Sequence, residues 1–171
     1  MKSQKGQDIV EFALLLPVFL VIICGIIYVG FFFGDFMTLN NWARSAAREA
    51  TVVEEWSGSG ENRTNNYDEI AKRYGDMIYD AQQHHRDDSP NERTIITSLY
   101  LYQPNNPMTV KGPGEHIFKH GPEDSVEVVI PMELNINADF VQTLSKLGIL
   151  STDPYNIIYY MYDETYQKSG S

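Results

Sequence analysis

The chain is poor in two kinds of residue, and each shortage excludes a class of protein. It has one cysteine, and it has 13 Lys+Arg against 23 Asp+Glu. A single cysteine excludes a disulfide framework within the chain and a zinc site built from several cysteines. The formal net charge of −10 argues against nucleic-acid binding, because such proteins need basic patches that neutralise phosphates. We therefore expect no nucleic acid among the partners.

The common signatures of catalysis are also missing. The sequence has no Gly-x-Ser-x-Gly motif, no Gly-rich phosphate loop and no Glu-x-x-His zincin core. His116 and His120 have the i, i+4 spacing of paired metal ligands. Gly-Pro pairs on both sides disfavour the helix that such a pair needs, so solvated loop histidines are the favoured interpretation. We expect no enzymatic activity, no metal and no cofactor.

Charge is absent from one long segment near the N-terminus. The 23 residues from Phe12 to Gly34 carry no charged side chain and are nearly all apolar. As a helix they would reach roughly 35 Å, enough to cross a hydrocarbon core of about 30 Å. This predicts a transmembrane helix at about residues 12–34. A cleaved signal peptide is the competing interpretation, but no A-x-A-like site follows directly. Cys24 lies inside the run and is interpreted as an ordinary membrane-helix residue.

The basic residues near the ends of the run predict its orientation. Lys2 and Lys5 precede it, and Arg44 is the first basic residue after it. The positive-inside rule then places the N-terminus in the cytoplasm and the remaining chain outside the cytoplasmic (inner) membrane. Residues 35–171 hold 11 basic and 21 acidic side chains, so the whole net charge belongs to that outer part.

The helix is predicted to continue beyond the membrane, over residues 7–56 in total. Small and apolar residues recur at spacings of three and four and form one stripe. The stripe comprises Phe36, Leu39, Ala43, Ala46, Ala50 and Val53. Small residues permit close approach of another element. The stripe can pack on the protein's own sheet or on helices of neighbouring subunits, and both are possible on different faces.

The remaining residues, 57–171, are predicted to form a small α+β ectodomain. We expect an antiparallel sheet of about three strands and two short helices. A helix begins near Asn66, with Glu69 as a capping partner. Strands are predicted at 94–102, 126–134 and 155–163, a short helix at 140–147, and a long loop at 103–125. Val126 to Leu134 alternate as in a half-buried strand, and Pro131 indicates an edge.

The most informative pattern lies just before the apolar run. Glu11 follows Gly6 by five residues, and Phe12 and a long apolar helix containing Pro17 come next. A carboxylate at the start of a membrane helix costs a few kcal/mol if it enters the bilayer unpaired, so it usually has a function. Taken alone, Glu11 would lie in the headgroup layer, favourably near the helix N-terminus.

The whole pattern resembles a type IV prepilin leader. The stretch GQDIVEFALLLPVFLVIICGIIYVG and the continuation NNWARSAAREATV resemble the TadE/TadG-like pseudopilins, or minor pilins, of tight-adherence (Tad, Flp-type) pilus systems. The resemblance covers about residues 5–53. It implies a leader at 1–6 and cleavage by prepilin peptidase between Gly6 and Gln7. Many pilins begin with an apolar residue where this chain has Gln7.

The resemblance also implies roles for three residues of the helix. Glu11, followed by Phe12, would pair with the new amine of Gln7 on a neighbouring subunit, which compensates the buried carboxylate. Pro17 would loosen the helix locally. The implied function is to assist assembly, initiation or capping of a Tad-type pilus in surface attachment. The implied partners are prepilin peptidase, other pilins and pseudopilins, the Tad assembly platform and membrane lipid. The alternative is a membrane-anchored binding or sensory ectodomain that does not polymerise.

Overall fold

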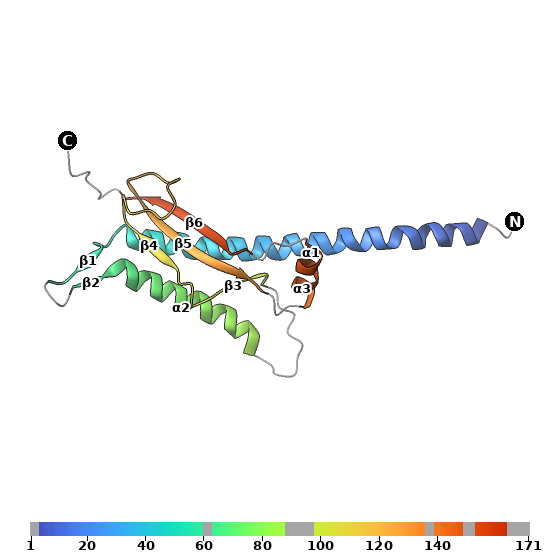
Figure 1. Cartoon of the computed structure of the whole chain (residues 1–171), viewed down its shortest axis with the longest axis horizontal. Coiled ribbons are helices and arrows are strands. Elements are labelled where there is room, and N and C mark those ends of the chain that lie inside the picture. Colours follow the sequence, from blue (N-terminus) through green and yellow to red (C-terminus); the bar gives the residue numbers. More distant parts are fainter. Residues whose placement is uncertain (1–3, 60–62, 88–97, 136–138, 149–152, 164–171) are drawn as a thin grey trace.

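The computed structural model describes residues 4–59, 63–87, 98–135, 139–148 and 153–163 (Figure 1). One very long helix, α1, carries a small domain on its C-terminal half, while its N-terminal half extends away alone (Figure 1). The helices are α1 (Gln4–Ala50), α2 (Asn66–Asp87) and α3 (Asp139–Lys146). The strands are β1 (Trp56–Ser57), β2 (Thr64–Asn65), β3 (Tyr100–Tyr102), β4 (Thr109–Lys111), β5 (Ser125–Leu134) and β6 (Tyr155–Tyr162). The expected α+β architecture is confirmed.

The C-terminal half of α1 is part of the domain's core. Leu39, Ala43, Ala46 and Ala50 are all buried, and Ala43, Ala46 and Ala50 are fully inaccessible. They pack in one cluster with α2 and with the residues of β5 that face the helices. Small side chains let the helix lie close against the sheet, and these residues pack on the protein's own sheet. Ala47, which the predicted stripe omitted, is equally buried.

α1 ends earlier than the sequence predicted. It stops at Ala50 instead of continuing to Trp56. Trp56 lies instead in β1, which pairs with β2 in a two-stranded antiparallel sheet. The start of α2 holds the intervening turn, because Asn66 donates to the carbonyls of Glu54 (2.6 Å) and Glu55 (2.7 Å). These bonds give hydrogen-bond partners to two backbone carbonyls of the turn.

The main sheet has four antiparallel strands instead of about three. β5 is central: β6 pairs along one side of it, and β3 and β4 share the other side. α1 contacts β5 and β6, and α2 contacts β3 and β4, so the two helices lie side by side on one face (Figure 1). β4 lies inside the segment that was predicted to be a loop. The predicted strand at 94–102 is seen only from Tyr100, and residues 94–97 lie outside the described residues.

The prediction that β5 is a half-buried edge strand is wrong. The strand is buried along nearly its whole length, including Glu127 and Pro131. The proline is tolerated because β3 pairs with residues 132–134 and β4 with residues 127–129. On that side of β5, Pro131 therefore falls between the two ladders, where neither β3 nor β4 needs its missing N–H, while on the other side it stands opposite Asn156 of β6.

The other helices follow the predicted pattern with small corrections. α2 buries Tyr67, Ile70, Ala71 and Ile78, whereas Ala81 at the end of the expected face is exposed. The cap is Asn65 instead of Asn66: its Oδ1 accepts from the N–H groups of Tyr67 (2.9 Å) and Asp68 (3.1 Å). The short helix predicted at 140–147 is present as α3, and the last strand as β6.

Candidate assembly site

The N-terminal half of α1 exposes an apolar surface on all sides. The large apolar side chains from Ile9 to Ile27 are exposed, and no part of the most apolar stretch is buried inside the protein. Figure 1 shows this part of the helix leaving the domain without contact to it. A soluble protein rarely leaves so large an apolar surface in water. The segment therefore fits a single membrane anchor.

The predicted cleavage residues lie at the start of α1. Gly6 and Gln7 fall within the first turns of the helix, which begins at Gln4. The resemblance implies that Gly6 enters the protease in an extended conformation. Cleavage between Gly6 and Gln7 would then require these first turns to unwind.

The predicted assembly residues lie on the free half of α1. Glu11 and Phe12 are exposed, and the Phe12 side chain is 67% accessible. Pro17 lies within the helix, which continues through it with one backbone donor fewer. These residues thus lie on the exposed surface of the chain, unlike Leu39, Ala43, Ala46 and Ala50, which the domain itself covers.

A hydrophobic junction joins the free half of α1 to the domain. Tyr28, Phe31 and Phe32 are half-buried against a cluster of Leu99, Leu134 and Val141, which lie just before β3, at the end of β5 and in α3. The ring of Phe32 also lies edge-on to those of Tyr100 (6.0 Å between centroids) and Tyr155 (6.3 Å). The sequence does not predict this contact, because Tyr28, Phe31 and Phe32 belong to the uncharged run and carry no separate signal.

Asp35 joins the two sides of the same junction with a hydrogen bond. Its Oδ2 accepts from the N–H of Leu99 at 2.8 Å. Burial raises the pKa of Asp35 above its ordinary value, and the hydrogen bonds from its neighbours oppose that shift. The sequence feature that could have identified Asp35 is its position, since it is the first charged residue after the run that ends at Gly34.

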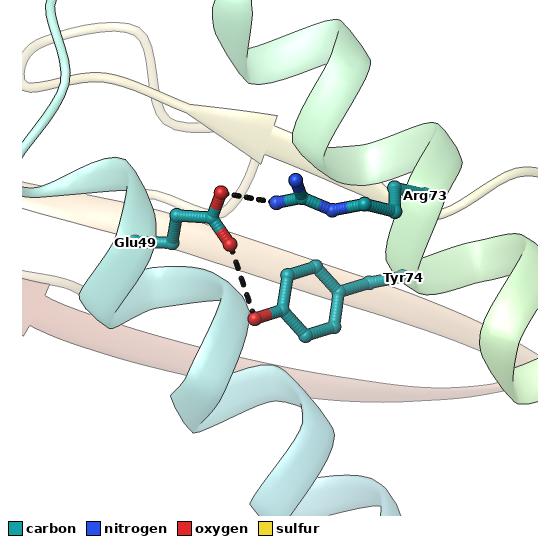
Figure 2. Close-up of polar contacts among 3 residues, drawn as sticks. All are labelled: Glu49, Arg73 and Tyr74. Atoms are coloured by element: carbon teal, nitrogen blue, oxygen red, sulfur yellow. Dashed lines mark hydrogen bonds and ion pairs between the residues drawn. The ribbon is translucent and has the colours of Figure 1, made fainter.

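A second polar link joins the end of α1 to α2. Figure 2 shows Glu49 between Arg73 and Tyr74, with one carboxylate oxygen bound to the Arg73 guanidinium and the other accepting from the Tyr74 hydroxyl at 3.2 Å. The two interactions use both oxygens of Glu49 and fix the last turn of α1 against α2. Because Arg73 is largely exposed, the ion pair itself stabilises the fold only slightly.

The loop between β4 and β5 is held by a buried carboxylate. Glu127 accepts from the N–H groups of Ile117 (2.6 Å) and Phe118 (3.0 Å) and from the hydroxyl of Tyr160 (3.0 Å). His116, considered as a metal ligand from the sequence, is bonded through Nε2 to the carbonyl of Ser125 at 2.6 Å. Within the described part of the chain, no three side chains of the metal-binding types gather at one place.

The comparison with protein families agrees with this geometry. Residues 6–48 match the family model described as TadE-like protein. This region of the chain is TadE-like. The match runs from the predicted cleavage residue through the free half of α1 and ends near the last buried alanine. It confirms the resemblance seen in the sequence and supports a membrane-anchored, pilus-associated protein. No curated protein and no solved structure matches the chain.

Proposed function

We propose that the chain is a non-enzymatic minor pilin, or pseudopilin, that assists assembly, initiation or capping of a Tad-type pilus. The observation that carries the proposal is the exposed apolar half of α1 inside the TadE-like match. Such a surface suits a helix that lies first in lipid and then among the helices of other subunits. The TadE-like match in itself suggests a minor pilin associated with a Tad pilus.

The proposed life cycle begins in the cytoplasmic membrane. The N-terminus lies inside with Lys2 and Lys5, and the acidic domain lies outside. Prepilin peptidase cuts between Gly6 and Gln7, and the mature chain begins at Gln7. The chain then interacts with other pilins or pseudopilins and with the Tad assembly platform, and it contributes to surface attachment.

Glu11 has the central role in assembly under this proposal. It lies four residues from Gln7 on the exposed half of α1, where a neighbouring subunit can reach it. The new amine of the neighbour's first residue would compensate its charge as the helices leave the headgroup layer. A carboxylate in a medium of low dielectric is unfavourable unless a positive charge pairs with it. Because cleavage creates that positive charge at the new N-terminus, incorporation depends on cleavage.

N-terminal sequencing and intact mass of the protein from cells with and without prepilin peptidase test the proposal. We expect the mature chain to start at Gln7 only when the peptidase is present. Retention of Met1–Gly6 in both strains would refute it and favour an anchored binding or sensory domain.

A matched pair of variants tests the assembly step. Glu11→Ala is expected to be cleaved normally but to be lost from sheared pilus fractions. Glu54→Ala changes an exposed carboxylate in the turn after α1 and should be incorporated like the wild type. Equal incorporation of both variants would exclude the proposed role of Glu11.

A further inference from the structure

We propose that the domain rests on the membrane through an interfacial foot, formed by the end of α3 and the start of β6, and that its ligand is the lipid headgroup layer. The foot comprises Lys146, Leu147 and Tyr155. This proposal rests on the membrane anchoring of α1. It adds a second, peripheral contact with lipid that the anchor does not by itself require.

The domain begins to contact α1 at a depth close to the membrane surface. A hydrocarbon core of about 30 Å corresponds to about 20 residues of helix. Counted from Phe12, the first residue after Glu11, such a core ends near Phe31. Yet the domain already packs against Tyr28, Phe31 and Phe32. The contacting part of the domain must therefore lie at the outer boundary of the core, within the headgroup layer.

The part of the domain at that depth is the end that carries α3. Val141 of α3 is buried in the cluster that contacts Tyr28 and Phe31. Figure 1 shows α3 beside α1 at the end of the domain that faces the free half of the helix. α3 and the start of β6 are thus the membrane-proximal end, while the opposite end of β5 points away from the membrane.

This end of the domain exposes apolar, aromatic and basic side chains. Leu147, which directly follows α3, is 67% accessible, and Tyr155 is 37% accessible. Lys146 lies in the last turn of α3, exposed and beside Leu147. An apolar side chain next to a lysine, with an aromatic nearby, is the composition of a segment that lies in the interface. The lysine would contact lipid phosphates, and the leucine would enter the acyl boundary.

The position of Leu147 is fixed by the end of α3. Its N–H donates to the carbonyl of Thr143 (3.1 Å), and the N–H of Gly148 donates to that of Ser145 (2.9 Å). Gly148 has a φ of 71°, the left-handed conformation that ends helices and that glycine adopts without strain. The backbone of Leu147 is therefore held by the hydrogen bonds that end α3.

Site-specific fluorescence in lipid vesicles tests the foot. Because Cys24 is the one cysteine of the chain, a Cys24→Ser background allows a single new cysteine to carry an environment-sensitive label. Leu147→Cys places the label on the foot. Ile117→Cys is the matched control, since Ile117 is 51% accessible and its N–H bonds to Glu127, which lies roughly 17 Å along β5 from Met132, the residue paired with Tyr155 of the foot. The wild-type Cys24 itself reports the membrane span.

The measurement is quenching by spin-labelled acyl chains compared with quenching by aqueous iodide, on the full chain in vesicles containing anionic lipid. We expect the lipid-to-iodide quenching ratio of the Leu147 label to be several-fold higher than that of the Ile117 label. If the Cys24 label is quenched by acyl chains while the Leu147 label behaves like the Ile117 label, the foot is wrong and the anchor stands. If the Cys24 label is quenched by iodide alone, both the anchor and the foot are wrong.

Discussion

Asp35 offers the sharpest test of how the helix and the domain are joined. Its carboxylate accepts the N–H of Leu99, which is buried at the start of the β3 segment. Asp35→Ala removes the acceptor and leaves that donor without a partner. A hydrogen bond to a charged group contributes about 1.5–3 kcal/mol, so we expect the junction to lose about 2 kcal/mol.

Asp35→Asn separates the hydrogen bond from the charge. The amide retains an oxygen that can accept from Leu99, but it carries no charge to be desolvated. Burial is the main cause of the raised pKa of Asp35, which means that the protein bears a cost for ionising it. We therefore expect the asparagine variant to remain within about 1 kcal/mol of the wild type at neutral pH.

The same argument predicts the effect of pH. A raised folded-state pKa means that, between pH 3.8 and that pKa, the folded chain binds more protons than the unfolded chain. The contribution of Asp35 to stability is thus greatest below pH 3.8 and falls as the pH rises through the folded-state pKa. The stability of the wild type relative to Asp35→Asn should therefore increase as the solution is acidified.

Hydrogen exchange of the Leu99 amide in the detergent-solubilised chain is the direct assay. A loss of about 2 kcal/mol corresponds to roughly 30-fold faster exchange in Asp35→Ala. Thr38→Ala is the control, since Thr38 is an exposed residue of the same helix whose hydroxyl bonds only to the carbonyl of Gly34 among the contacts seen. Unchanged exchange in Asp35→Ala, or equal acceleration in Asp35→Asn, would refute the reasoning.

Two further predictions concern the core of the domain. Ala46→Leu adds volume at a fully buried position between α1 and the sheet, so it should lower the free energy of unfolding by about 1–3 kcal/mol. Ser45→Leu, on the exposed side of α1, should leave the melting temperature unchanged. Equal effects of the two substitutions would contradict the packing of α1 on the sheet. Burial, reinforced by Asp163, Glu55 and Glu115, raises the pKa of Tyr67 to about 12, so stability should fall between pH 10 and 12 in the wild type and less steeply in Tyr67→Phe. Absorbance of tyrosinate and thermal melts over that range measure both effects.

The elements that the sequence predicted well are those in which a single requirement, to place apolar side chains in lipid or in the core, determines the pattern of residues. The charge-free run from Phe12 to Gly34 forms a long apolar helix that fits a membrane anchor, and the alanine stripe after it marks a face that must be covered. The period of Tyr67, Ile70 and Ile78 likewise fixes the inner face of α2. Each of these segments is long, so that local exceptions do not hide the period.

The errors arose where a polar residue is buried and satisfied by partners far along the chain. Glu127 in β5 indicated a solvent-facing position, but the N–H groups of Ile117 and Phe118 and the hydroxyl of Tyr160 allow it to be buried. β4 was missed because a three-residue strand between prolines and glycines has no detectable period. It forms because the exposed edge of β5 offers it a ladder. Asp35 was missed for the same reason as Glu127, since its partners lie some 64 residues away.

The continuity of α1 has a consequence for assembly. The same helix carries the exposed surface around Glu11 and the buried alanines of the core, with no linker between them. The domain is also fastened to the helix at two levels, by Asp35 near the membrane and by Glu49 at the last turn. If the proposed incorporation moves α1 out of the bilayer, the domain must therefore move with the helix. Under the two proposals above, that step detaches Leu147 from lipid at the moment when Glu11 finds its partner, so the lost lipid contact must be offset by the new contacts between subunits.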